Sequence, residues 1–137
     1  RRKKISVSLN VKDDMSIKWY ENEFNHIILI ILENAYDNFE LVKQTNPQIK
    51  ISVTETKSFY RIDISDNGGG IEDEIIDKIF NPYFTTKFQK EGSGIGLYMA
   101  KMIIEQNSNG KIDVNVSNGI TTFNIVINKG IENEVEL

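Results

Sequence analysis

The stretch from Tyr60 to Ile71 reads YRIDISDNGGGI and combines a strand pattern with the break that ends it. Every second residue from Tyr60 to Ile64 is apolar, which predicts a β-strand with one buried face. Three glycines then follow Asp66 and Asn67 and break the pattern. Glycine permits positive φ and leaves room for a flat ligand beside the backbone, and an aspartate at a strand end can accept a hydrogen bond from an amine. The residues alone leave open whether this is a ligand site or a surface turn.

Outward from this stretch, paired strand patterns alternate with helical patterns. Apolar alternation predicts strands over residues 5–11, 17–20, 49–53, 60–64, 112–116 and 123–127, and the first is expected to be half-buried. Helices are predicted over residues 22–42, 72–79 and 94–106, with a loop at 81–93. Strand pairs separated by helices predict an α+β fold, a two-layer sandwich with a mixed, mostly antiparallel sheet and helices on one face. Strict βαβ alternation is absent, which argues against a dinucleotide-binding fold.

Composition indicates one ordinary globular domain. The 137 residues are 39% hydrophobic and 26% charged, which excludes a disordered chain. We expect a single domain with a core over about residues 5–128 and an acidic tail at 129–137. The net charge is -4 and the only basic run is Arg1–Lys4, so no nucleic-acid partner is predicted.

Cysteine and hydropathy bear on the compartment. The chain has no cysteine, which excludes disulfides and thiolate metal sites and fits a reducing cytoplasm. The longest strongly apolar run, Ile27–Leu32, is too short to span a bilayer, and no signal-peptide pattern opens the chain. A cytoplasmic location is therefore expected.

A second glycine run precedes the last predicted helix. It consists of Gly92, Ser93, Gly94, Ile95, Gly96 and Leu97. Glycines before a helix expose backbone N–H groups, and the helix dipole favours an anion there, so the run suits phosphate. It lacks the Lys-Ser/Thr of a P-loop and the spacing of a dinucleotide fingerprint. The alternative is simple helix capping in a flexible loop.

Polar residues interrupt the apolar pattern of the first predicted helix. Asn34 follows a strongly apolar stretch, and Asp37 and Asn38 lie one turn after it. The Asn34 amide oxygen can bind Mg²⁺, a cation that prefers oxygen ligands, although these residues can equally form the solvated face of the helix. His26 is the only histidine, and we expect it to be partly exposed in the first turn of the helix.

The order and spacing of these motifs resemble the histidine-kinase branch of the ATPase superfamily shared with gyrase, heat-shock chaperones and mismatch-repair proteins. Leu32–Ala35 is similar to its N box, Asp66–Ile71 to its G1 box, Ile79–Lys87 to its F box, Gly92–Leu97 to its G2 box and Gly119–Phe123 to its last, weaker box. The resemblance runs from about residue 7 to residue 127. The F-box stretch most separates a histidine kinase from its relatives.

The resemblance implies the ATP-binding (Bergerat) sandwich with a mobile lid between the F and G2 boxes. At the adenine end, Asp66 would accept the adenine amino group. Gly68 and Gly70 would let the backbone approach the purine, and Ile71 completes the same motif. Thr121 would support this end of the site through the Asp66 region.

At the triphosphate end, the resemblance implies that Asn34 would hold Mg²⁺ between the phosphates. Asp37 or Asn38, one turn further along the helix, could assist it. Lys87 would neutralise phosphate charge from the lid. The residues Gly92–Leu97 would cradle the phosphates at the start of the following helix. Asn34 and Lys87 would be the catalytic residues.

The implied function is that of the catalytic domain of a two-component sensor histidine kinase, which transfers the ATP γ-phosphate to a histidine on a separate dimerisation domain. A response regulator would be an indirect partner. The isolated domain is expected to be a monomer from a homodimeric parent, with membrane anchoring of the parent left open. No autophosphorylation by this chain alone is expected, because His26 lacks the context of a phosphoacceptor.

One departure keeps other readings open. The family usually places Asn or Glu four residues before Asn34, where this chain has Ile30. Isoleucine can neither bind Mg²⁺ nor activate water, which argues against an intrinsic ATPase. The alternatives are a degenerate nucleotide-binding module without phosphotransfer, a serine kinase or anti-sigma factor of the same superfamily, or a purely structural domain.

Overall fold

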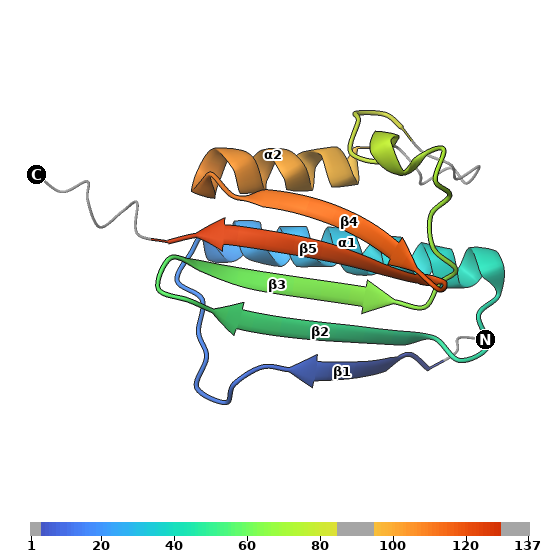
Figure 1. Ribbon diagram of the computed structural model, residues 1–137, viewed down its shortest axis with the longest axis horizontal. Helices are drawn as coiled ribbons and strands as arrows, with labels where there is room; N and C mark the ends of the chain where they lie inside the picture. The colour runs from blue at the N-terminus through green and yellow to red at the C-terminus, as the bar shows by residue number, and fades with distance from the viewer. Residues whose placement is uncertain (1–3, 85–94, 130–137) are drawn as a thin grey trace, which may run out of the picture.

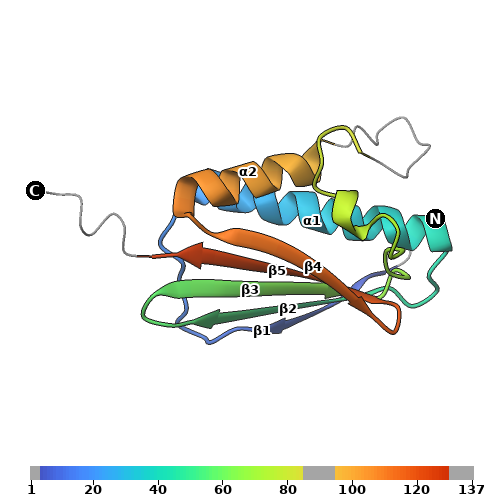
Figure 2. The ribbon, with the colours of Figure 1, turned by 45° about the horizontal axis from the view of Figure 1, so that its top comes forward.

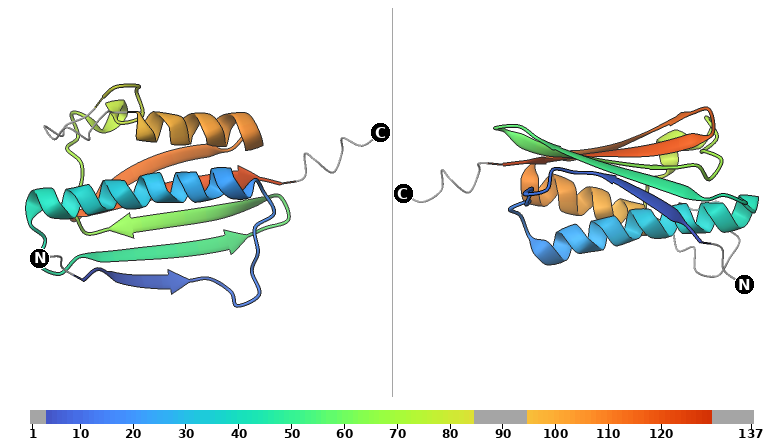
Figure 3. Two further views of the ribbon diagram at one scale, coloured as in Figure 1. Left: turned by 180° about the vertical axis from the view of Figure 1, so that it is seen from behind. Right: turned by 90° about the horizontal axis from the view of Figure 1, so that it is seen from below.

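The computed structural model describes residues 4–84 and 95–129, which form a sheet with both α-helices on one face (Figures 1 and 3). The strands lie in the order β1 (Ser6–Asn10), β2 (Gln48–Glu55), β3 (Phe59–Asp66), β5 (Ile120–Asn128) and β4 (Lys111–Ser117). The helices are α1 (Glu21–Val42) and α2 (Gly96–Ser108), with a 3-10 turn η1 (Ile76–Lys78) between β3 and α2. β1 and β2 are parallel and every other neighbouring pair is antiparallel. The predicted α+β sandwich is confirmed.

Helix α1 forms where the apolar periodicity predicted it. Two acidic residues in its first turn, Glu21 and Glu23, complement the helix dipole. It ends at Val42 because Lys43 adopts the left-handed conformation and its N–H bonds back to the Glu40 carbonyl. His26 is exposed, as expected.

The core fills the space between the sheet and the two helices. Its buried members come from both layers: Ile27, Ile31, Ala35, Phe39, Ile49, Tyr60, Ile62, Ile64, Ile79, Ala100, Ile104, Ile112, Phe123, Ile125 and Ile127. The two hairpins confirm the predicted strand pairs, and Asn118 and Gly119 have the positive φ of a two-residue turn that joins β4 to β5. Neither helix in the described part of the chain is long and apolar enough to cross a lipid bilayer.

Two predicted elements are absent or reduced. No strand forms over residues 17–20, because Ile17 and Trp19 pack against the core from an irregular segment, and the Lys18 N–H donates to the Tyr60 hydroxyl instead of to a neighbouring strand. The predicted helix over 72–79 is a turn followed by η1 alone. Helix α2 starts at residue 96 and continues to 108, two residues beyond the prediction, because Asn109 is the residue that adopts the left-handed conformation.

The first strand forms but is not half-buried. All five residues of β1 are exposed, including Val7 at 55% and Leu9 at 68% of their full areas. Seen from behind in Figure 3, α1 and α2 cover the middle and the β4 side of the sheet, whereas β1 lies at the opposite edge. Alternation therefore predicted the strand correctly and its burial wrongly, because no helix lies over this edge.

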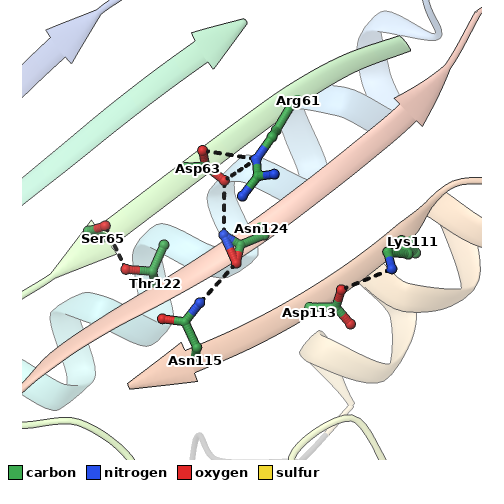
Figure 4. A network of polar contacts seen from close by, with 8 residues as sticks. All are labelled: Arg61, Asp63, Ser65, Lys111, Asp113, Asn115, Thr122 and Asn124. Atoms are coloured by element: carbon green, nitrogen blue, oxygen red, sulfur yellow. Dashed lines mark hydrogen bonds and ion pairs between the residues drawn. The ribbon is translucent and has the colours of Figure 1, made fainter. Parts of the chain in front are cut away.

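The opposite face of the sheet is polar and carries its own hydrogen-bond network (Figure 4). Arg61 Nε donates to the Asp63 carboxylate over 3.1 Å, and Asp63 Oδ1 accepts from Asn124 Nδ2 over 2.9 Å. Asn124 Oδ1 in turn accepts from Asn115 Nδ2 over 3.2 Å. These polar side chains pair with one another along the face that the helices leave uncovered.

The end of the sandwich that carries the predicted site is visible in Figure 2. There the end of β3, the β4–β5 turn, the second half of α1 and the segment leading to α2 come together. The predicted tail starts at Lys129, but this residue is held to the sheet, because its N–H donates to the Ser58 carbonyl and its ammonium to Glu55. Residues 130–137 lie outside the described residues.

Candidate nucleotide site

Asp66 and Thr121 lie opposite each other on neighbouring strands. Asp66 ends β3 and pairs with Thr121 near the start of β5. Both are buried, with exposures of 3% and 0%. Their side chains share the inward face of the sheet with Ile64 and Phe123, two residues along each strand. The predicted association of Thr121 with the Asp66 region has its physical basis in this register.

Within the described part of the chain, the Thr121 hydroxyl has no hydrogen-bond partner. Its Oγ1 is the one buried side-chain polar atom without a partner among residues 4–84 and 95–129. A hydroxyl buried in this way costs free energy unless a hydrogen bond compensates. The structure therefore holds an unsatisfied polar atom beside a buried carboxylate, which is an arrangement suited to a polar ligand.

Two opposing effects act on the Asp66 carboxyl. Burial raises its pKa above the ordinary range for aspartate, because the charged form loses hydration. The hydrogen bond that the Gly68 N–H donates to Asp66 Oδ1 over 2.9 Å lowers the pKa, and burial is the larger effect. An amine donor would favour the charged form of this carboxylate.

The glycine loop lies against the second half of α1 and has no room for side chains. A Cβ on Gly68 would stand 2.9 Å from Asn38 Cβ and 3.0 Å from Asp66 Oδ1. Gly70 has φ +85°, and a Cβ there would lie 2.7 Å from Val116 Cγ1 and 4.0 Å from Thr121 Oγ1. Gly68 is therefore required by the close approach, and Gly70 by both the close approach and its backbone conformation. Ile71, the last residue of the predicted motif, is partly buried against the core.

Asn34 and Asn38 lie one turn apart on α1. Asn38 Nδ2 donates to Asn34 Oδ1 over 3.4 Å, at the long end for a hydrogen bond. Because Asn38 also lies under Gly68, the two amides connect the Asp66 loop to the middle of α1. The Asn34 oxygen keeps a second lone pair that can accept from a water or bind a cation.

The start of α2 faces α1 through Ile30 and Gly96. A Cβ on Gly96 would stand 3.3 Å from Ile30 Cγ2, so the two helices approach closely at this point. Ile95 is the N-cap residue, and Leu97 is partly buried against the core. No side chain of the described residues caps this helix start, and no acidic residue lies in its first turn. The first N–H groups of an α-helix have no acceptor within the helix, so a helix start with no acidic residue in its first turn suits an anion.

Part of the predicted triphosphate end falls outside the described residues. Lys87, Gly92, Ser93 and Gly94 lie in the range 85–94, as does the predicted lid. Six of the predicted site residues contact one another in one connected set: Asp66, Gly68, Gly70, Thr121, Asn38 and Asn34. Gly96 at the start of α2 packs against Ile30, one turn before Asn34 on α1. No role was predicted for Val116, which only the β4–β5 register brings to Gly70.

The residues fit a nucleotide better than they fit a tightly held metal ion. A glycine cradle beside a buried carboxylate and an unpartnered hydroxyl suits a flat heterocycle that carries an amine. In the described ranges, no group of three or more His, Cys, Asp or Glu side chains is placed to hold a metal. Asn34 offers a single neutral oxygen, which is compatible with Mg²⁺ carried largely by phosphates and water.

A cavity lies elsewhere in the molecule. It measures about 530 Å³, and its walls include Trp19, Phe24 and Ile51. None of the predicted site residues lines it, and its apolar walls offer no cluster of catalytic groups. The polar groups suited to binding a nucleotide therefore lie at the Asp66 end of the sandwich and not in this cavity.

The comparisons with known proteins agree with this geometry. The family model for histidine kinase-, DNA gyrase B- and HSP90-like ATPases matches residues 20–131. A probable C4-dicarboxylate sensor kinase of Bacillus subtilis (strain 168) is 33% identical over 132 residues, covering 92% of this chain and 24% of that protein. This chain spans about a quarter of the length of the first curated relatives that it matches.

Solved structures show the same fold. The nucleotide-free catalytic domain of the histidine kinase ThkA superposes with a TM-score of 0.78 at 26% identity, covering 91% of this chain and 79% of that one. ThkA in complex with the response regulator protein TrrA matches with a TM-score of 0.74 at 24% identity, over 93% of this chain and 35% of that one. Taken with the matched range of residues 20–131, these findings show that the chain belongs to the histidine kinase-, DNA gyrase B- and HSP90-like ATPase family, as an ATP-binding catalytic domain of the histidine-kinase type.

Proposed function

We propose that this chain binds ATP between Asp66 and the start of α2 and transfers the γ-phosphoryl group to a histidine on a separate dimerisation domain. The observation that carries the proposal is the buried, unpartnered Thr121 Oγ1 beside the Asp66 carboxylate. A purine with an exocyclic amine supplies a donor for Asp66, and its ring nitrogens or a shared water supply a partner for the hydroxyl. Gly68 and Gly70 let the backbone of this turn pack closely beside the carboxylate that would bind the ring.

At the triphosphate end, the proposed contacts come from Asn34, Lys87 and the Gly92–Leu97 run. The backbone N–H groups of this run and the dipole of α2 attract the phosphates. Lys87 neutralises the negative charge that the leaving group gains. Asn34, whose oxygen accepts from Asn38, would hold Mg²⁺, and the cation when bound would withdraw charge from the phosphate oxygens.

Phosphoryl transfer requires mainly positioning and charge neutralisation from the protein. The bond from the γ-phosphorus to the bridging oxygen breaks, a bond to the histidine nitrogen forms, and ADP leaves. Ile30 lies one turn before Asn34 and packs against Gly96, so an apolar side chain occupies the position from which a polar one could activate water. This placement favours transfer to a protein nitrogen over hydrolysis.

The proposed partners follow from this reaction. The nucleophilic histidine belongs to a dimerisation domain of a homodimeric parent, and the phosphoryl group passes from it to a response regulator. A response regulator is bound in the ThkA complex, which has the same fold. We place the reaction in the cytoplasm. We expect no autophosphorylation of this chain by itself, because its single histidine, His26, lies on α1, the helix that carries Asn34, and lacks the His-Glu/Asp context of a phosphoacceptor.

Thermal unfolding with ATP, ADP and Mg²⁺ tests the binding site. We expect the native chain to gain stability with ATP, the Asp66→Ala variant to lose that gain, and Asn34→Ala to lose mainly the part that depends on Mg²⁺. Equal shifts in all three proteins would contradict the site.

A second assay tests the reaction. The chain is mixed with a dimerisation domain of a related sensor kinase and γ-labelled ATP, and label on the histidine is measured with and without Mg²⁺. Transfer supports the proposal. Tight ATP binding without transfer to any supplied domain would instead favour the degenerate nucleotide-binding module that Ile30 suggests.

A further inference from the structure

Asn67, between Asp66 and Gly68, is held at every polar group. Its N–H donates to the Gln48 carbonyl over 3.3 Å, and its own carbonyl accepts from Gln44 Nε2 over 2.6 Å. Its side-chain Oδ1 accepts from the Gln48 N–H over 2.8 Å, and its Nδ2 donates to the Asn46 carbonyl over 3.1 Å. All four polar groups of one residue are thus satisfied by the connection between α1 and β2.

These bonds join parts of the chain that are far apart in sequence. The partners of Asn67 precede it by 19 to 23 residues. Asn46 is itself held, because its N–H donates to Gln44 Oε1 over 3.1 Å. The turn after β3 is therefore fastened to the end of α1, the helix that carries Asn34 and Asn38.

The fastened residue lies next to the carboxylate at the adenine end. Gly68 donates its N–H to Asp66 Oδ1 over 2.9 Å, so the turn at Asn67 sets where that donor lies. The same turn sets how closely Gly68 approaches Asn38. Asn67 is followed by Gly68, Gly69 and Gly70. Because glycine restricts the backbone least of all residues, this run cannot fix the conformation of the turn by itself.

We propose that Asn67 is a positioning residue for adenine recognition, which holds the Asp66 carboxylate and the Gly68 backbone in place by tying their turn to the α1–β2 connection. The inference rests on the proposed ATP site. It adds a residue that contacts the protein only and acts through Asp66.

A structural role alone would weaken all nucleotides to the same degree, so the test compares ATP with inosine triphosphate. The two share the triphosphate and ribose, but inosine has a carbonyl oxygen where adenine has the amino group. The ratio of their affinities for the Mg²⁺-loaded chain therefore reports the hydrogen bond to Asp66. We expect the native chain to prefer ATP and Asp66→Ala to lose the preference.

We expect Asn67→Ala to lower the ATP preference about three- to tenfold, as for the loss of a single well-placed hydrogen bond. Gln44→Ala removes the donor to the Asn67 carbonyl and the acceptor of the Asn46 N–H, and it should lower the preference by a smaller factor because both side-chain hydrogen bonds of Asn67 remain. Asn115→Ala is the matched control, because it removes an exposed amide with a similar hydrogen bond on the far face of the sheet, and it should keep the native ratio.

The outcomes separate the two proposals. If Asp66→Ala keeps the ATP preference of the native chain, the proposed ATP site is wrong. If Asp66→Ala loses the preference while Asn67→Ala and Gln44→Ala both keep it, the site stands and the positioning role of Asn67 is wrong. Should Asn67→Ala fail to fold, the ratio measured for Gln44→Ala decides.

Discussion

Replacing Thr121 by valine should stabilise the empty protein and weaken its ligand. The Thr121 Oγ1 atom is buried and has no partner among the described residues, and valine has nearly the same shape with a methyl group there. Protein mutations put the cost of burying an unpaired hydroxyl at about 1–3 kcal/mol. Taking the lower half of that range, we expect about 1–2 kcal/mol of added stability and a Tm about 4–8 °C higher.

The same substitution removes a proposed contact with the purine. Loss of one hydrogen bond to the ligand should weaken ATP binding about three- to tenfold. The stability change and the affinity change therefore have opposite consequences for the liganded protein. With ATP in excess, the advantage of Thr121→Val in Tm should shrink or vanish.

Urea denaturation without ligand and calorimetric titration with Mg²⁺ and ATP measure the two effects. Thr122→Val is the matched control on the adjacent position of β5, because the Thr122 hydroxyl hydrogen-bonds with Ser65 Oγ over 2.8 Å and its loss should destabilise. A Thr121→Val variant that is less stable than the native chain, or that binds ATP equally well, would refute the assignment of Thr121 as an unsatisfied ligand contact.

Three further predictions concern the same end of the sandwich. Because burial raises the Asp66 pKa, the folded chain binds the carboxyl proton more tightly than the unfolded chain does. The native chain therefore loses stability as pH rises through the folded pKa of Asp66. In urea denaturation, the stability of Asp66→Asn relative to the native chain should increase from acid to neutral pH. Gly70→Ala, at φ +85° and 2.7 Å from Val116 Cγ1, should cost about 1–2 kcal/mol by the same assay, and no loss would show that the turn relaxes freely. Ile30→Asn adds an amide one turn before the proposed metal contact, so it should enlarge the Mg²⁺-dependent part of the ATP-induced Tm shift. It should also lower stability without ligand, because it replaces the apolar contact with Gly96. An unchanged Mg²⁺-dependent shift would contradict the idea that this position limits metal binding.

Much of the secondary structure could be predicted because it depends on local patterns. The helix over residues 22–42 repeats apolar side chains at helical spacing, and the strands of the hairpins alternate apolar with polar side chains. The sequence of each element therefore indicates which of its faces is buried. Asn118-Gly119 specifies its turn through backbone conformations that few other residues adopt. The segment at 17–20 misled for the same reason, since Ile17 and Trp19 alternate with polar residues without joining the sheet.

The site was predictable only in its motifs. The Asp66–Ile71 run and the helix containing Asn34 stood out as residues, and the resemblance placed them in one family, which the comparisons confirm. Their contacts with one another did not follow from any local pattern. The roles proposed for Lys87 and the Gly92–Gly94 residues stay predictions, since they lie outside the described residues.

By itself, the sequence determined the two α-helices, five of the six predicted strands, the α+β class and the nucleotide-binding motifs, because each depends on residues close together in the chain. Tertiary structure alone decided that β1 lies beyond the cover of the helices, that Thr121 meets Asp66 across the β3–β5 register, and that Asn67 is tied to residues 44–48. These are juxtapositions of distant segments. They are set by how the sheet pairs and where the helices pack on it, and one sequence on its own carries no direct signal of either.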